Sequence, residues 1–164
     1  MKNFHVGIIG GGVIGSSIAW ELSKYKLDVV VFEKGSDVAS GSSKANSGVI
    51  HSGINSKPDS LKAKFCVEGN KMFQQLSDLL GFPIIFTGKY VIAKNNDEIK
   101  HLGELKKVGK QNGVPNLEIK TEINEPNVYC EAALSVPTAG IVLPYSMTIA
   151  LAAVSYTHLT LPTN

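Results

Sequence analysis

The stretch "GIIGGGVIGSSIAW" (residues 7–20) places five glycines within nine positions and then continues as an apolar run. Before it, "FHVGIIG" (4–10) is short, apolar and β-branched, which predicts a buried strand. After it, "VIGSSIAWELSKYK" (13–26) carries apolar residues at helical spacing, which predicts a helix. The glycines therefore fall between a strand and a helix, where the backbone is open to close approach by another group.

A second strand is predicted directly after the helix. The segment "LDVVVFEK" (27–34) is almost uninterruptedly hydrophobic, as expected of a parallel strand that is covered on both faces. The strand, helix and strand together span about 30 residues, the length of a βαβ unit with a right-handed crossover. The sequence thus predicts an α/β fold that begins with a βαβ unit.

Three of the glycines, Gly10, Gly12 and Gly15, fit the pattern G-x-G-x-x-G. In this pattern the first glycine allows a tight turn, the second lets a pyrophosphate approach the backbone, and the third lets helix and strand pack closely. The N–H groups and the positive dipole end of the helix N-terminus then face the diphosphate. A tight turn without a ligand is the alternative explanation of these residues.

An acidic residue ends the second predicted strand. Glu33 follows Gly10 by 23 residues, a position at which a carboxylate accepts hydrogen bonds from the ribose of an adenosine. A glutamate there, rather than a basic residue, also disfavours a 2′-phosphate. The register of strands, glycines, helix and carboxylate predicts a bound dinucleotide, and both NAD and FAD satisfy it. The alternative is a glutamate that faces solvent.

The next segment favours FAD over NAD. "SGSSKANSGVIHSG" (40–53) contains five serines, three glycines and one asparagine, which supply hydrogen-bond donors with little bulk. Such a segment can lie against the phosphates and sugar chain of a cofactor, whereas the βαβ unit of an NAD dehydrogenase would normally continue into a simple helix. A polar surface loop is the alternative interpretation of this composition.

Three separated segments resemble a known family. Residues 6–34, residues 37–70 ("DVASGSSKANSGVIHSGINSKPDSLKAKFCVEGN") and residues 125–152 ("EPNVYCEAALSVPTAGIVLPYSMTIALA") are similar to the D-amino-acid-oxidase-like flavoproteins. The branch that they resemble most is the bacterial FAD-dependent glycerol-3-phosphate dehydrogenase-like proteins. L-2-hydroxyglutarate oxidases are similar through the same "NSGVIHSG" region. The resemblance covers nearly all of residues 4–153.

The resemblance implies a truncated, three-layer, Rossmann-like FAD-binding domain with the beginnings of a substrate cap. In that family a second half carries the rest of the sheet, most of the cap and a late glycine-rich flavin contact. The implied cofactor is non-covalently bound FAD, and no metal is expected. The predicted cofactor-binding residues are Gly10, Gly11, Gly12, Val13, Ile14, Gly15, Glu33, Lys34, Ser42, Ser43, Asn46, Ser47 and Gly48.

The candidate catalytic residue is His51, the one histidine that lies within a motif. Histidine side chains have an ordinary pKa of about 6.5, which suits a general base. Similar flavoproteins also carry a histidine here, near the isoalloxazine. In such enzymes a carbon gives a hydride to flavin N5 while a base takes the heteroatom proton. A structural histidine in the flavin wall is the alternative.

The reaction expected from the resemblance is the oxidation of a small anionic 2-hydroxy compound, with sn-glycerol 3-phosphate giving dihydroxyacetone phosphate as the first choice. The first alternative keeps FAD but takes L-2-hydroxyglutarate or an amino acid as substrate. The second alternative is a dinucleotide-binding module or fragment without catalysis. The sequence contains sixteen lysines and no arginine, so an arginine clamp for a substrate anion must lie outside this chain or be absent.

The composition limits the classes of partner expected for the protein. A chain of 164 residues with a net charge of +2 is typical of one globular domain, and so small a charge argues against nucleic acid. Cys66 and Cys130 fit no disulfide or metal motif, which predicts reduced thiols. No signal peptide or membrane-spanning run is predicted, so cytoplasmic location is expected, with a peripheral membrane association or an electron-acceptor subunit as candidate partners.

Further elements are predicted along the chain. Helices are expected over 59–81 and over 96–113. The first has a possible Asp or Ser cap and an apolar face formed by Leu61, Phe65, Met72, Leu76 and Leu80. The remaining predicted elements are a strand at 88–94, two short strands at 132–137 and 139–144 around a Pro-Thr turn, and a helix that starts at 145.

The end of the sequence breaks the pattern. In "VSYTHLTLPTN" (154–164) the helical spacing lapses, and the stretch resembles a translated sequencing adapter. We therefore expect residues 1–153 to be the native part of an FAD-binding oxidoreductase domain and 154–164 to be a non-native tail. A genuine loop is the alternative.

Overall fold

The computed structural model describes residues 3–158, which divide into two compact units. Unit 1 comprises residues 1–48, 75–83 and 142–164, and unit 2 comprises residues 49–74 and 84–141. Helix α2 (Leu61–Leu80) contributes residues to both units. Each unit has its own core, so each is described by itself.

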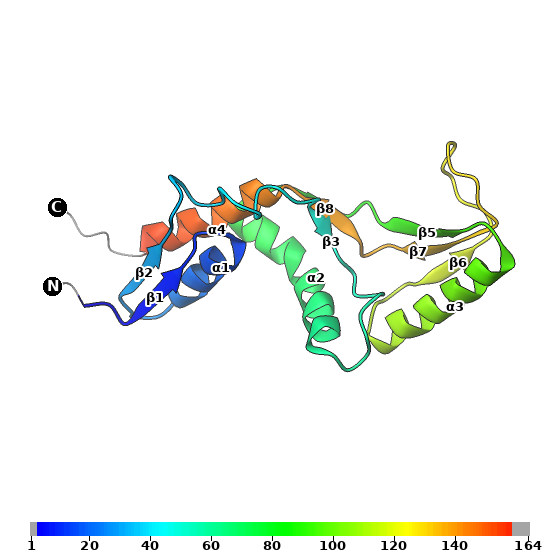
Figure 1. Ribbon diagram of the computed structural model, residues 1–164, viewed down its shortest axis with the longest axis horizontal. Coiled ribbons are helices and arrows are strands. Elements are labelled where there is room, and N and C mark those ends of the chain that lie inside the picture. The colour runs from blue at the N-terminus through cyan, green and yellow to red at the C-terminus, as the bar shows by residue number, and fades with distance from the viewer. Residues whose placement is uncertain (1–2, 159–164) are drawn as a thin grey trace. The chain divides into compact units, whose positions relative to one another are not determined.

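Unit 1 begins with the predicted βαβ arrangement. Strand β1 (Val6–Ile9) pairs in parallel with β2 (Val29–Phe32), and helix α1 (Val13–Leu22) connects them (Figure 1). A small core forms because Ile8, Ala19 and Val29 are buried together. The α/β fold and its parallel start are therefore confirmed.

The two-stranded sheet of unit 1 buries only part of its apolar surface. Ile9 and Phe32 are register partners at the carboxyl ends of β1 and β2. Their exposed fractions are 91% and 58%, although the strand pattern predicted cover on both faces. The predicted cover is thus present on the α1 side only, within the described part of the chain.

Helix α4 (Pro144–His158) completes unit 1 and packs beside α1 (Figure 1). Ser155 is buried, and its Oγ donates to the carbonyl oxygens of Leu151, at 2.7 Å, and Ser16, at 3.4 Å. The expected loss of helical structure near Ala153 is therefore wrong: the small Ser155 side chain satisfies its own hydroxyl within the helix and allows close packing. The non-native origin of 154–164 stays a prediction, and its residues 159–164 lie outside the described residues.

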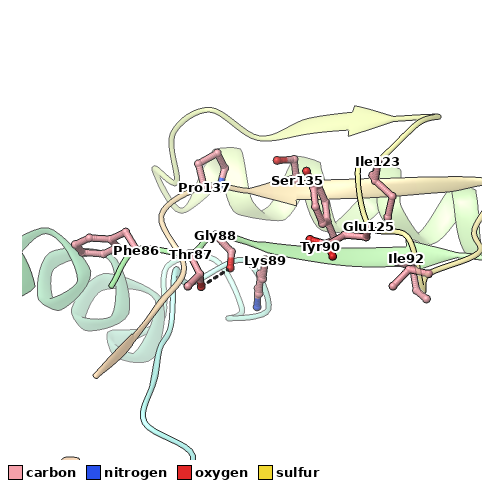
Figure 2. A pocket seen from close by; sticks show the side chains of 11 residues that line it. Phe86, Thr87, Gly88, Lys89, Tyr90, Ile92, Ile123, Glu125, Ser135 and Pro137 are labelled. Atoms are coloured by element: carbon pink, nitrogen blue, oxygen red, sulfur yellow. Dashed lines mark hydrogen bonds between the residues drawn. The ribbon is translucent and has the colours of Figure 1, made fainter. Parts of the chain in front are cut away.

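Unit 2 contains a three-stranded antiparallel sheet. The strand order is β5 (Lys89–Ala93), β7 (Ala132–Val136) and β6 (Glu118–Lys120), with Tyr90 and Ser135 as register partners. These two residues line an open hollow of about 670 Å³ on one face of the sheet, together with Glu125 (Figure 2). The predicted strand at 88–94 is confirmed.

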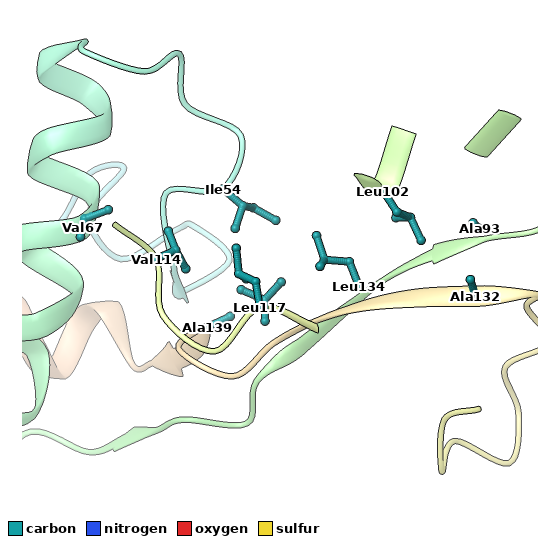
Figure 3. Packing of buried hydrophobic residues seen from close by; sticks show 10 residues of the cluster. Ile54, Val67, Ala93, Leu102, Val114, Leu117, Ala132, Leu134 and Ala139 are labelled. Carbon is teal, nitrogen blue, oxygen red and sulfur yellow. The ribbon is translucent and has the colours of Figure 1, made fainter. Parts of the chain in front are cut away.

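The other face of that sheet packs on helix α3 (Asn96–Gln111). Leu102 of α3 and Leu134 of β7 are fully buried in the core of unit 2 (Figure 3). Helix α3 begins at its N-cap Asn95, whose side chain accepts from the Glu98 N–H at 3.0 Å, and its end is followed by Gly113 at φ +84°. The predicted helix over 96–113 is confirmed.

Three short strands form a second sheet. The order is β3 (Val49–Ile50), β8 (Gly140–Val142) and β4 (Ile84–Ile85). The two strands predicted around the Pro-Thr turn both form, and as β7 and β8 they belong to different sheets. Gly140 allows β8 to pair with β4 and not with β7. A Cβ at Gly140 would lie 2.7 Å from the carbonyl oxygen of Ile85, so β4 approaches the backbone of β8 closely.

Helix α2 starts as predicted, with Ser60 Oγ accepting from the Ala63 N–H at 3.1 Å. Its buried residues are Ala63 and Val67. The predicted apolar face is wrong for Leu61, Phe65 and Met72, which are 71%, 60% and 50% exposed, whereas Leu76 and Leu80 are half-buried. The fully buried positions of the helix are thus those of its smaller apolar side chains.

Candidate dinucleotide-binding site

The glycine turn between β1 and α1 has the geometry that the pattern predicts. Gly10 has φ +100°, a conformation that favours glycine, and a Cβ there would meet open space. A Cβ at Gly15 would overlap the carbonyl oxygen of Gly10 and lie 3.3 Å from Ile8 Cγ2. The roles predicted for Gly10 in the turn and for Gly15 in close packing therefore agree with the geometry.

Glu33 contacts the glycine turn directly. Its Oε2 accepts from the Gly11 N–H at 2.6 Å, and its Oε1 accepts from the Gly35 N–H at 2.7 Å. These backbone donors, Gly35 first and Gly11 second, lower the pKa of the Glu33 carboxyl below its ordinary value of 4.5. The carboxylate is thus ionised and fixed beside the turn, with lone pairs left for hydroxyl donors.

Ser43 caps the helix that follows the turn. Its Oγ accepts from the Val13 N–H, in the first turn of α1, at 2.9 Å. A Cβ at Gly12 would lie 2.9 Å from the same Oγ. Gly12 therefore admits the serine hydroxyl to the helix N-terminus, a role that the pattern alone did not predict. The approach of a pyrophosphate at Gly12 stays a prediction.

The backbone around the turn leaves donors unused. Within the described residues the N–H groups of Gly12 and Ile14 have no hydrogen-bond acceptor, as is typical of the first turn of a helix. They lie beside the positive end of the α1 dipole, which favours an anion. Ala39 closes the other side of the turn: it is buried at φ +58°, and its N–H donates to the Gly11 carbonyl at 3.0 Å.

Hydrogen bonds of Asn46 hold part of the serine-rich segment at residues 42–48. The Asn46 amide donates to the carbonyls of Ser42, at 3.1 Å, and Ser43, at 3.2 Å, and its Oδ1 accepts from the Gly48 N–H at 2.9 Å. Gly48 is buried at φ +64°. The structure thus brings Ser43 to the turn and makes Asn46 a brace of the loop. Lys34 and Ser47 are exposed, and their cofactor contacts stay predictions.

His51 belongs to unit 2, in the loop that follows β3. Its side chain is exposed, and its backbone carbonyl accepts from the Asn70 amide at 3.1 Å. Asn70 also donates to the Thr138 carbonyl at 2.8 Å, so one side chain joins the loop to the turn after β7. The same loop is fixed by Asn112, whose amide donates to the Gly53 and Ser56 carbonyls.

Sequence reasoning missed the asparagines that fix the loop and the residues that share a cavity with His51. Ser52, Lys62, Cys66 and Lys89 line this cavity. They come from a loop, a helix and a strand, so no local motif unites them. Cys66 is a half-buried free thiol, and the expectation of reduced cysteines is consistent with that state.

Comparison with known proteins identifies the family. The family described as FAD dependent oxidoreductase matches residues 5–155, which is most of the chain. The chain belongs to this family. FAD is the cofactor that defines it, and the predicted resemblance is confirmed. Oxidoreductase chemistry is therefore the activity class of the family to which the chain belongs.

Individual relatives agree with this assignment. A glycerol 3-phosphate dehydrogenase from Caloramator mitchellensis is 48% identical over 91% of this chain and 32% of its own length. The human mitochondrial L-2-hydroxyglutarate dehydrogenase is 38% identical over 86% of this chain and 32% of its own length. The chain thus spans about a third of the length of these curated relatives.

A solved structure shows the same fold. The dithionite-reduced L-α-glycerophosphate oxidase from Mycoplasma pneumoniae, with FAD bound, matches with a TM-score of 0.91 and 34% identity. The match covers 97% of this chain and 44% of that protein. The truncated, Rossmann-like fold expected from the sequence is thereby confirmed.

The residues around the glycine turn fit the ADP part of FAD. The open space at Gly10 and the free N–H groups of Gly12 and Ile14 suit a diphosphate, and the lone pairs of Glu33 suit ribose hydroxyls. Within residues 3–158 no three His, Cys, Asp or Glu side chains are grouped as metal ligands. In the same residues no helix is both long and apolar enough to cross a bilayer.

Proposed function

We propose that the protein oxidises sn-glycerol 3-phosphate to dihydroxyacetone phosphate with FAD bound at the glycine turn of unit 1. The observation that carries the proposal is the carboxylate of Glu33 fixed on the Gly11 N–H at 2.6 Å, beside a helix N-terminus with free donors. The identity of 48% with a glycerol 3-phosphate dehydrogenase supports the choice of substrate.

In this proposal, residues of the glycine turn and Glu33 bind the cofactor, and His51 accepts the proton. Gly12 and Ile14 donate N–H groups to the diphosphate, and Glu33 accepts from the adenosine ribose. FAD, when bound, supplies N5 as the acceptor of a hydride. Oxidation of the secondary alcohol removes that hydride from the carbon and a proton from the hydroxyl, which leaves the ketone. His51 takes the proton on an imidazole nitrogen.

The loop geometry suits this role for His51. The ring is exposed and therefore accessible to a substrate, while Asn70 fixes the backbone of the same residue through its carbonyl. A positioned base of this kind contributes about 10²–10⁴ to the rate. A small anionic substrate is the partner in this proposal, and because this chain has no arginine, any clamp for the substrate anion within it depends on lysine.

A direct test uses the protein expressed from its complete reading frame. Under anaerobic conditions, sn-glycerol 3-phosphate is expected to bleach the flavin absorbance, and L-2-hydroxyglutarate is not. His51→Asn is expected to slow flavin reduction by about 10²–10⁴. His101→Asn is the matched control, because His101 is an exposed histidine on α3 that contacts only Glu104 in the described hydrogen bonds.

Two outcomes would contradict this proposal. An unchanged rate of flavin reduction in His51→Asn would show that His51 is a structural residue beside the flavin and not the base. Activity that requires added NAD, in a protein without flavin absorbance, would show that FAD is not the cofactor of the reaction. The second candidate substrate is L-2-hydroxyglutarate, which the relative at 38% identity favours. Bleaching by L-2-hydroxyglutarate alone would select that candidate.

A further inference from the structure

A small polar cavity lies within unit 2, next to the His51 loop. It has a volume of about 180 Å³ and is lined by residues 51–56, Lys62, Cys66 and Lys89. Pockets for drug-sized ligands measure about 300–1,000 Å³, so this cavity has room for a small molecule or for one charged group. A dinucleotide does not fit in it.

The cavity has positive charge without a counter-charge. Lys62 comes from the first turn of α2 and Lys89 from the start of β5, and none of the lining residues is acidic. Neither lysine forms an ion pair within the part of the chain that the structure describes. Figure 2 shows the Lys89 side chain pointing away from Tyr90, as expected of successive residues of a strand, although Lys89 also lines the large hollow.

Both lysines occupy unfavourable positions in the absence of an anion. Lys89 is half-buried, and burial lowers the pKa of its ammonium group because desolvation disfavours the charged form. Lys62 stands at the positive end of the α2 dipole, where a cation is disfavoured, and the first turn of α2 contains no acidic residue. A bound anion would offset both the desolvation of Lys89 and the repulsion between Lys62 and the helix dipole.

Ser52 adds a hydrogen-bond donor without a partner. It lines the same cavity and is only 2% exposed. Its Oγ is buried and has no hydrogen-bond partner among the described residues, which is an unfavourable state for a polar group. An oxyanion in the cavity would supply the missing acceptor, because the hydroxyl hydrogen rotates to suit its partner.

The wall that carries Ser52 is fixed from two sides. The Asn112 amide donates to the Gly53 carbonyl at 2.9 Å and to the Ser56 carbonyl at 2.8 Å. A Cβ at Gly53, which has φ +96°, would lie 2.9 Å from Val67 Cγ2, so the loop lies directly against α2. The backbone of this wall is thus fixed before a ligand binds, which lowers the ordering cost of binding.

We propose that this cavity is a binding site for a small oxyanion, a phosphate or a carboxylate, which Lys62 and Lys89 pair with and to which Ser52 donates a hydrogen bond. His51, the base proposed above, lines the same cavity, so the anion site adjoins the proposed reaction site, and it is tested below without any measurement of activity. An anionic metabolite, or the charged end of one, is the class of ligand that it takes.

Lysine footprinting tests the site in the folded protein expressed from its complete reading frame. Lysines are acylated with and without inorganic phosphate at matched ionic strength, and modification is measured for each residue by peptide mass spectrometry. Phosphate is expected to protect Lys62 and Lys89. Lys64 is the matched control, since it lies in the same first turns of α2 but lines a different hollow. A parallel arm with acetate distinguishes a phosphate site from a general oxyanion site.

A variant gives the second measurement. Lys62→Ala is expected to raise the phosphate concentration for half-protection of Lys89 by about tenfold, the effect of losing one charge-assisted hydrogen bond. Ser52→Ala is expected to raise it less. Equal protection of Lys64, no protection of Lys89, or an unchanged half-protection in Lys62→Ala would each overturn the proposal. None of these readouts uses activity, so failure here leaves the proposed oxidation standing.

Discussion

Glu33 Oε2 and the Gly11 N–H are 2.6 Å apart, although 22 residues separate them in the chain. This hydrogen bond joins the end of β2 to the turn after β1, so the acidic residue and the glycines form one structural element. The carboxylate organises the turn and also presents its remaining lone pairs beside it. Replacing Glu33 therefore affects both the stability of the turn and the affinity for FAD.

The first prediction concerns cofactor affinity. Glu33→Gln removes the charge that strengthens hydrogen bonds from ribose hydroxyls, and FAD affinity is expected to fall by about 10- to 100-fold. The measurement is the dissociation constant from flavin fluorescence in the protein expressed from its complete reading frame. Glu104→Gln, an exposed change on α3, is the control. Equal affinities of Glu33→Gln and wild type would contradict a ribose contact.

The second prediction is a pH dependence of stability. The folded-state pKa of Glu33 lies below 4.5 because Gly35 and Gly11 donate to the charged form. The unfolded state then binds more protons in acid, so this contribution to stability is present above 4.5 and is lost as the pH falls through the folded pKa. In urea denaturation the difference between wild type and Glu33→Gln is expected to shrink on acidification below 4.5. A difference that grows would show that the linkage has the opposite sign.

The third prediction concerns close packing at the turn. Gly15→Ala places a methyl group on the Gly10 carbonyl, and the free energy of unfolding is expected to fall by about 1–3 kcal/mol. Gly103→Ala is the matched control, because a Cβ there meets open space in helix α3. That change is expected to raise the free energy of unfolding by about 0.5–1 kcal/mol. Thermal denaturation measures both, and a harmless Gly15→Ala would remove the packing role.

The fourth prediction concerns the loop that carries His51. Asn112→Ala removes both hydrogen bonds to the Gly53 and Ser56 carbonyls, at a cost of about 1–3 kcal/mol because these bonds are part-buried. Amide hydrogen exchange of residues 53–56 is expected to accelerate, while exchange in unit 1 stays unchanged. Asn95→Ala, which removes the N-cap of α3, is the comparison. If exchange in the loop is the same in both variants, Asn112 does not fix it.

The βαβ start and its glycine turn were predictable because each depends on local pattern. Hydrophobic runs gave β1 and β2, and the spacing from Gly10 to Glu33 placed the carboxylate beside the turn. The role of Gly12 was not predictable, because it depends on Ser43, 31 positions further along the chain, reaching the helix N-terminus. The glycine motif predicts where the backbone of the turn is accessible. Which side chain contacts that backbone depends on the tertiary structure.

The elements that the sequence did not predict share one physical cause, which is pairing between distant segments. Strands β3, β4 and β6 have two or three residues, too few for a periodic pattern, and they form because neighbouring strands pair with them. The separation of β7 from β8 likewise depends on β4. The cavity lined by Ser52, Lys62 and Lys89 combines a loop, a helix and a strand, so the sequence offered no spacing by which to find it.

The pair formed by β1 and β2 has a practical consequence for handling the chain. Two parallel strands alone are marginally stable, and each of their outer edges offers unpaired backbone groups beside the bare side chains of Ile9 and Phe32. Such an edge favours pairing with a strand of another copy. We therefore expect the 164-residue chain to self-associate as its concentration rises, which light scattering measures.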